Sequence, residues 1–128
     1  MDVIIDASCV MSILLGEDEA KKVKEQTAGI TLVSPTCLPY EVGNSLTSSV
    51  KRHRIDAEII TDIFKEFKKM PIRLVETDIE KALKIAADEH HYAYDAYYVS
   101  CALERGLPLF SLDNRLIEIA KKRGVECL

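Results

Sequence analysis

Five short, mostly apolar runs alternate with longer segments of helical pattern, and this alternation constrains the fold more than any other feature. The runs are VII at 3–5, ITLVS at 30–34, IRLVE at 72–76, LPLFS at 107–111 and VEC at 125–127. No Asn-Gly or similar hairpin signal joins two of them. Strands that are separated by helices pair in parallel. We therefore predict a three-layer α/β/α sandwich with a mainly parallel central sheet.

The segments between the runs predict seven helices. They cover the stretch from the first strand to Leu15, then 17–26, 38–54, 56–69, 78–89, 91–106 and 114–123. Gly16, Pro71 and Gly106 mark three of their ends. No internal repeat or linker interrupts the pattern, so residues 1–128 are expected to form one domain.

Charge and cysteine content exclude several classes of protein. The net charge is −4, so no large basic field predicts nucleic-acid binding. The four cysteines lack CxxC spacing, which favours free thiols in a reducing cytoplasm. An acid at position 2 and no basic start argue against a signal peptide. The longest uncharged run, 26–40, is too short to span a membrane. We expect a soluble, cytoplasmic protein.

Four acids fall where ligands bind in open α/β sheets, beyond the carboxyl ends of the strands. Asp6 follows the first strand, and Asp113 follows LPLFS. Glu41 lies in the first turn of the helix after ITLVSP, and Asp95 lies near the start of the helix at 91–106. Each Asp could simply cap a helix. That reading does not suit Glu41, because a capping box would need Ser or Thr where Leu38 stands.

Convergence of the four acids would point to a metal. Carboxylates that share one edge repel each other, and capping does not require them to meet. Binding of Mg²⁺ or Mn²⁺ would require the carboxylates to meet, since both ions prefer oxygen ligands and can activate a bound water. Asn44, one turn after Glu41, could add a neutral oxygen. Ser8 and Ser111 could hydrogen-bond the carboxylates or a water, although local backbone bonding is the simpler role for these three residues.

The three histidines are not expected to bind that metal. His90 and His91 are adjacent, and neighbouring helical residues point about 100° apart, so both cannot face one ion. Oxygen ligands also suit the acids better than imidazole does. We therefore predict surface or helix-entry roles for His53, His90 and His91.

The segments VIIDAS, PYEVGNSL and YDAYYVSCALERGLPLFSLDNRL resemble the PIN-domain ribonucleases, most closely the VapC-type toxins of toxin–antitoxin pairs. The resemblance covers essentially the whole chain and places Asp6, Glu41, Asp95 and Asp113 on the family's acidic positions. It implies metal-dependent RNA cleavage that leaves a 5′-phosphate and a 3′-hydroxyl. It also implies a homodimer and a possible antitoxin partner. Asn114 falls where members vary, which leaves the number of metals open.

Two sequence features bear on partners. The apolar stripe of 59–67 could form a dimer interface or pack inside the domain. In a dimer, Lys51, Arg52 and Arg54 could contact RNA phosphate despite the negative net charge.

Other functions remain open to different degrees. A haloacid-dehalogenase-type phosphatase would need an Asp where Ser8 stands, and no nucleotide-binding glycine motif occurs. A housekeeping RNA-processing nuclease without an antitoxin is a further possibility. So is a PIN-like module that binds RNA or protein without cleaving, although such a module has no need of mutually repelling acids.

Overall fold

A parallel sheet of four strands forms the centre of the computed structural model, which describes residues 1–128. The strands are β1 (Asp2–Ile5), β2 (Thr31–Pro35), β3 (Ile72–Val75) and β4 (Leu109–Phe110). Their order is β3-β2-β1-β4, and all neighbours pair in parallel. The register aligns Val33 with Ile4 on one side and with Arg73 on the other. The predicted parallel sheet is confirmed.

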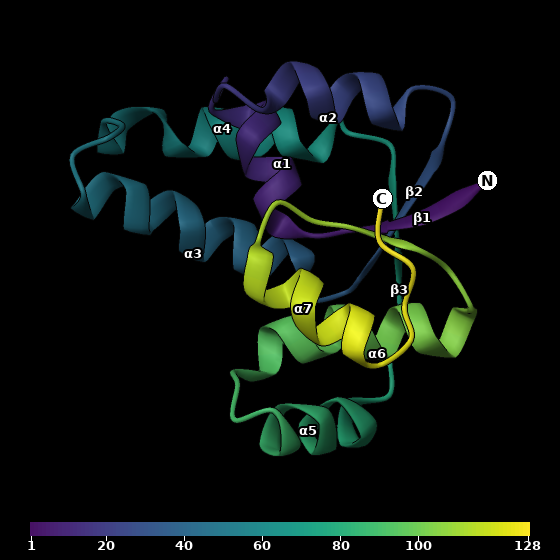
Figure 1. The fold of residues 1–128 in the computed structure, drawn as a ribbon. Helices are drawn as coiled ribbons and strands as arrows, with labels where there is room; N and C mark the ends of the chain where they lie inside the picture. The colour runs from purple at the N-terminus through teal and green to yellow at the C-terminus, as the bar shows by residue number, and fades with distance from the viewer.

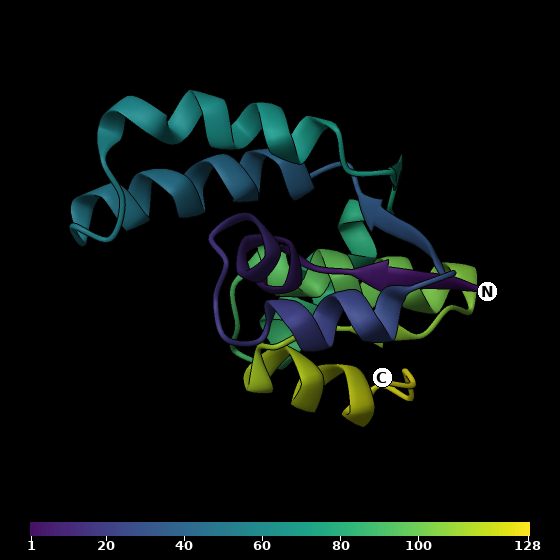
Figure 2. The same cartoon turned by 90° about the horizontal axis from the view of Figure 1, so that it is seen from above.

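Helices cover both faces of this sheet. They are α1 (Ala7–Leu14), α2 (Ala20–Thr27), α3 (Leu38–Lys51), η1 (Ala57–Ile59), α4 (Ile60–Lys68), α5 (Ile79–Asp88), α6 (Ala93–Arg105) and α7 (Asn114–Lys122). In Figure 1, α1, α2 and α4 lie above β1, and α5, α6 and α7 lie below it. Figure 2 shows α3 and α4 side by side as an arm that extends from the body. The α/β/α architecture is confirmed.

The predicted fifth strand at 125–127 is wrong. Only Cys127 bridges to β4, through an isolated pairing with Leu109. The chain turns at Gly124, whose φ of 86° suits glycine, just before this single bridge. The predicted helix at 56–69 differs at its start, because it begins as the 3-10 turn η1 and the Asp56 side chain accepts no capping hydrogen bond.

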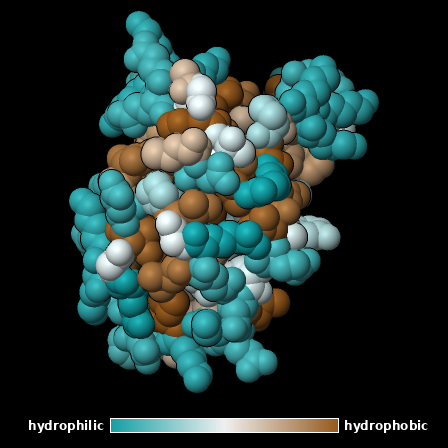
Figure 3. Space-filling model, turned by 90° about the vertical axis from the view of Figure 1, so that its right-hand side faces the viewer, coloured by the Kyte–Doolittle hydropathy of each residue, from teal (hydrophilic) through white to brown (hydrophobic).

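The core forms where the sheet meets the helices. It contains 27 buried apolar residues, among them Val3, Ile4 and Ile5 of β1, which are fully buried. Seen from the side where β1 begins, hydrophobic residues show in the middle of the molecule and hydrophilic ones predominate round the rim (Figure 3). Because β1 is central and buried on both faces, the residue that follows it is held rigidly at the carboxyl edge of the sheet.

The helices are short. The longest, α3, has 14 residues, and none combines the length and the apolar content that crossing a membrane requires.

Candidate functional site

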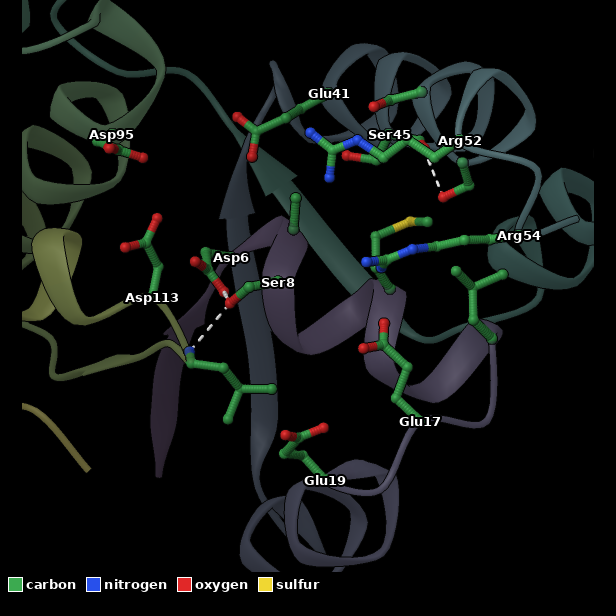
Figure 4. Close-up of a pocket in the computed structure, with 16 residues that line it drawn as sticks. Asp6, Ser8, Glu17, Glu19, Glu41, Ser45, Arg52, Arg54, Asp95 and Asp113 are labelled. Carbon is green, nitrogen blue, oxygen red and sulfur yellow. Dashed lines mark hydrogen bonds between the residues drawn. The ribbon is translucent and has the colours of Figure 1, made fainter.

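A cleft of about 390 Å³ opens at the carboxyl edge of the sheet, between α1, α3 and the start of α6. All four acids named from the sequence line it: Asp6, Glu41, Asp95 and Asp113. They come from four separate segments of the chain, and Figure 4 shows them round one side of the cleft.

Asp6 is the most firmly held of the four. It is only 4% exposed and caps α1 by accepting a bond from the Cys9 amide at 3.2 Å. Ser8 Oγ donates to Oδ1 at 2.7 Å, and Ser111 Oγ donates to Oδ2 at 2.6 Å. Burial nevertheless raises the pKa of Asp6 above its usual value, against the effect of these hydrogen bonds. The two serines tie the end of β1 to the loop after β4.

Glu41 is the acid with a buried oxygen that lacks a partner. Tyr98 donates to its Oε1 at 3.4 Å, and its Oε2 is buried with no hydrogen-bond partner. Burial, helped by the charges of Asp6 and Asp95, raises the pKa of Glu41 to about 7. An unpaired buried carboxylate oxygen is costly, so this side chain is poised to accept a proton or a cation.

Asp95 does not cap α6, because the N-cap position belongs to Tyr92 and Asp95 accepts no backbone amide there. Its Oδ2 instead bonds His91 Nε2. Arg115 lies 3.0 Å from His91 Nδ1. A guanidinium only donates hydrogen bonds, so His91 Nδ1 accepts from Arg115. The other ring nitrogen, Nε2, then carries the hydrogen and donates it to Asp95 in a hydrogen bond. Burial raises the pKa of Asp95, while the His91 contact lowers it.

His91 was therefore underestimated by sequence reasoning. Its side chain is 6% exposed, which contradicts a surface role, although it does lie at the entry to α6. The signal available in the sequence was the i, i+4 spacing of His91 and Asp95.

Asp113 is the N-cap of α7. Its Oδ1 accepts bonds from the amides of Arg115 at 2.9 Å and Leu116 at 3.4 Å. The capping role considered for this residue is real, and it leaves the other carboxylate oxygen available to the cleft.

The donor chemistry of the cleft fits a hard divalent cation, but the four acids do not form a closed metal centre. No group of three or more His, Cys, Asp or Glu side chains is arranged to hold a metal ion. Mutual repulsion and the local partners of Asp6, Asp95 and Asp113 account for the separation. Mg²⁺ typically takes one or two carboxylates and keeps several waters. The unpaired Oε2 of Glu41, beside Asp6 and Asp95, meets that requirement.

The remaining predicted residues divide between the cleft and the outside. Arg52 and Arg54 line the cleft, and Figure 4 shows both guanidinium groups inside it. Lys51 and Asn44 are exposed and do not line it. For Asn44 the reason is helical geometry, since Ser45 occupies the position one turn after Glu41 that faces the cleft.

Two further acids, Glu17 and Glu19, form the opposite rim of the cleft. Sequence reasoning assigned them only to a polar helix, and nothing in their spacing distinguishes them from ordinary surface residues. With them the cleft carries six acids and two arginines, so it is strongly anionic as it stands.

The sequence matches the PIN domain family over residues 3–122. The chain belongs to the PIN domain family. Its resemblance to that family, which was noted from the residues around the four acids, is confirmed. No curated protein matches this PIN domain.

Solved structures show the same fold. A protein from Pyrobaculum aerophilum matches with a TM-score of 0.72 at 21% identity, over 99% of this chain and 83% of that one. The sarcin-ricin loop cleaving toxin VapC20 of Mycobacterium tuberculosis matches with a TM-score of 0.66 at 13% identity, over 96% and 95%. VapBC2 of Rickettsia felis, bound to a promoter DNA fragment, matches with a TM-score of 0.65 at 11% identity, over 100% of this chain and 98% of that one. VapC-type toxins are thus among the structural neighbours of this PIN domain.

Proposed function

We propose that this PIN domain is a divalent-metal-dependent ribonuclease that hydrolyses phosphodiester bonds. The observation that carries the proposal is the buried, unpaired Oε2 of Glu41, which lies in an open cleft beside Asp6 and Asp95. A structural carboxylate would be paired. One that is buried, unpaired and repelled by its neighbours is suited to a positively charged ligand.

The chain's own residues have distinct tasks in this proposal. Glu41 would hold Mg²⁺ or Mn²⁺ together with waters, and Asp6, Asp95 and Asp113 would bind the ion directly or through those waters. Ser8 and Ser111 fix the orientation of Asp6.

On the other side of Asp95, His91 donates to this acid and is itself held by Arg115. Such outer partners orient a ligand and set its basicity. Arg52 and Arg54 are the only basic side chains in the cleft, and they would neutralise phosphate as RNA enters.

A bound divalent cation would supply the charge that offsets the carboxylates and the phosphate, and would activate a water for attack. No side chain in the cleft needs to act as a dedicated general base.

We further propose that the protein is the toxin of a toxin–antitoxin pair. The support is the resemblance of its acidic segments to VapC-type toxins and the presence of toxin–antitoxin complexes among its structural neighbours. A housekeeping RNA-processing role has its own support in a match to the PIN endonuclease Utp24, with a TM-score of 0.55. Co-expression with the product of a small adjacent reading frame distinguishes the two roles, since only a toxin gains a tight inhibitor from it.

A homodimer is part of the proposal, although its sequence argument is weaker than expected. In the stripe at 59–67, Phe67 is buried and Ile60, Ile63 and Phe64 pack against the core. Ile59 alone remains well exposed, at 42%. Light scattering at micromolar concentration tests the dimer, and a monomer would remove it from the proposal.

Cleavage assays on single-stranded and structured RNA test the activity. Asp95→Asn should reduce the rate at least about 100-fold, the scale of losing one positioned catalytic group. EDTA should abolish cleavage, and Mg²⁺ or Mn²⁺ should restore it. Asp88→Asn is a matched control, because Asp88 is exposed, lies outside the cleft and forms a 3.5 Å surface ion pair with Arg123. A wild-type rate for Asp95→Asn, or cleavage that continues in EDTA, would contradict the proposed metal-dependent mechanism.

A further inference from the structure

Tyrosines gather beside the acidic cleft. The chain has five tyrosines and no tryptophan. One of them, Tyr98, is buried under Glu41. Tyr40, Tyr94 and Tyr97 line a separate depression of about 280 Å³, here called the tyrosine pocket. Tyr40 is 76% exposed and Tyr94 is 42% exposed, so their rings are open to solvent.

The tyrosine pocket and the acidic cleft share the same two helices. In α3, Glu41 faces the cleft and the preceding Tyr40 faces the pocket. In α6, Asp95 faces the cleft, and Tyr94 and Tyr97 face the pocket. The two helix starts therefore form a ridge with carboxylates on one side and aromatic rings on the other. A strand of RNA that runs from the acids across these two helix starts would reach the tyrosine pocket.

The lining of the tyrosine pocket selects against phosphate. Its floor is made by residues that follow β2 and β3, with Pro35 and Ile79 as apolar surface. Its one charged side chain is Glu76, and it contains no Lys or Arg. A phosphate would be repelled there, whereas a flat, neutral group with an aromatic face would not.

The aromatic rings are also arranged in advance. Tyr94 and Tyr97 meet edge to face, with centroids 6.0 Å apart and planes at 85°. Such pairs are favourable and hold the rings in place. Bases stack on exposed aromatic side chains in many proteins that bind single-stranded nucleic acid.

We propose that the tyrosine pocket binds one unpaired nucleobase of the RNA substrate, next to the phosphodiester bond held at the acids. This inference rests on the proposed ribonuclease function and adds to it a binding site for one base. A base inside a duplex is stacked and cannot enter the pocket without being extruded. The backbone would continue over the cleft toward Arg52 and Arg54, which would bind phosphate.

Binding and cleavage of a short single-stranded RNA test the proposal separately. The dissociation constant is measured by fluorescence anisotropy with Ca²⁺ in place of Mg²⁺, and KM and kcat are measured with Mg²⁺. Tyr40→Leu and Tyr94→Leu keep apolar bulk but remove the flat ring. Each should raise the dissociation constant and KM about tenfold, the scale of one base–aromatic stack, with kcat changed less than about twofold. Tyr40→Phe and Tyr94→Phe should behave as wild type.

Tyr92→Leu is the matched control, because Tyr92 is 83% exposed but lies outside the tyrosine pocket. An RNA with one abasic ribose at the position that enters the pocket should lose the same tenfold in wild type, and lose nothing further in Tyr40→Leu. A thermal melt of each variant verifies the fold.

The outcomes separate this inference from the proposed function. If wild type fails to cleave but the Leu variants still lose affinity for RNA, the base pocket stands and the nuclease activity falls. If wild type cleaves and the Leu variants bind and cleave like wild type, the base pocket is overturned. A loss of dimer mass in the Leu variants with unchanged RNA affinity also overturns it, because the pocket would then be a protein interface.

Discussion

Glu41 and Glu89 have the same side chain in opposite electrostatic surroundings. Glu89 follows α5, and its two oxygens bind Lys122 and Arg123, each at 2.9 Å. These bonds lower the pKa of Glu89. Glu41 has no cationic partner in hydrogen-bond contact, one of its oxygens is unpaired, and burial raises its pKa to about 7. The first arrangement joins α5 to α7, and the second leaves a charge unbalanced at the edge of the sheet.

The difference separates a carboxylate held in ion pairs from the acids that we propose bind a cation. A fold can balance an acid with Lys or Arg wherever only stability matters, as it does at Glu89. In the cleft, the acids instead accept hydrogen bonds from hydroxyls, an imidazole and backbone amides. Those partners orient carboxylates without neutralising them, which preserves their attraction for a cation.

Replacing each glutamate by glutamine should give the largest contrast. Glu41→Gln should reduce RNA cleavage about 100-fold or more, because a positioned charge in the cleft is lost. Glu89→Gln should leave kcat within about twofold of wild type, because it weakens only two ion pairs that lie outside the cleft. Initial rates at saturating Mg²⁺ give both numbers. Equal losses in the two variants would mean that the contrast reflects stability alone.

Removing the partner of Asp95 should have the next largest effect. His91→Gln should lower activity about 10- to 100-fold and weaken Mg²⁺ binding, since loss of an outer hydrogen bond typically costs that much. The control is His90→Asn. His90 is exposed and has φ of 53°, a conformation that Asn tolerates. A metal titration of cleavage rate distinguishes weaker metal binding from a general loss, and identical metal curves would exclude a positioning role for His91.

The stability of the metal-free protein should fall as pH rises. Glu41 has its folded-state pKa raised from 4.5 to about 7, so the folded state binds the proton more tightly than the unfolded state. This contribution is full below about pH 4.5 and is lost as pH rises through about 7. The loss should be about 1 to 3 kcal/mol, because the open cleft screens part of the shift. Urea denaturation in EDTA at pH 5 and pH 8 measures it, and Glu41→Gln should show a smaller difference than wild type.

Much of the fold was predictable because it depends on local patterns. VII at 3–5 and the helix at 91–106 have periodicity that burial enforces, and the acids after the strands follow from a parallel sheet. The contact between His91 and Asp95 was not predicted, because it depends on which rotamers the packing of α6 and α7 permits. The exclusion of Asn44 in favour of Ser45 depends on a rotation of α3 that periodicity alone does not fix. Glu17 and Glu19 gave no signal at all.

Thermal melts with and without metal test the central claim, that the cleft holds unbalanced negative charge for a cation. At pH 8 in EDTA, Glu41→Gln should melt a few degrees above wild type, corresponding to about 1 kcal/mol. Asp6→Asn and Asp95→Asn should shift in the same direction, with Asp95→Asn less affected because it weakens the bond to His91. Excess Mg²⁺ should stabilise wild type more than the variants and close or reverse the gap. Variants that melt at or below wild type in EDTA, with no selective effect of Mg²⁺, would contradict the account.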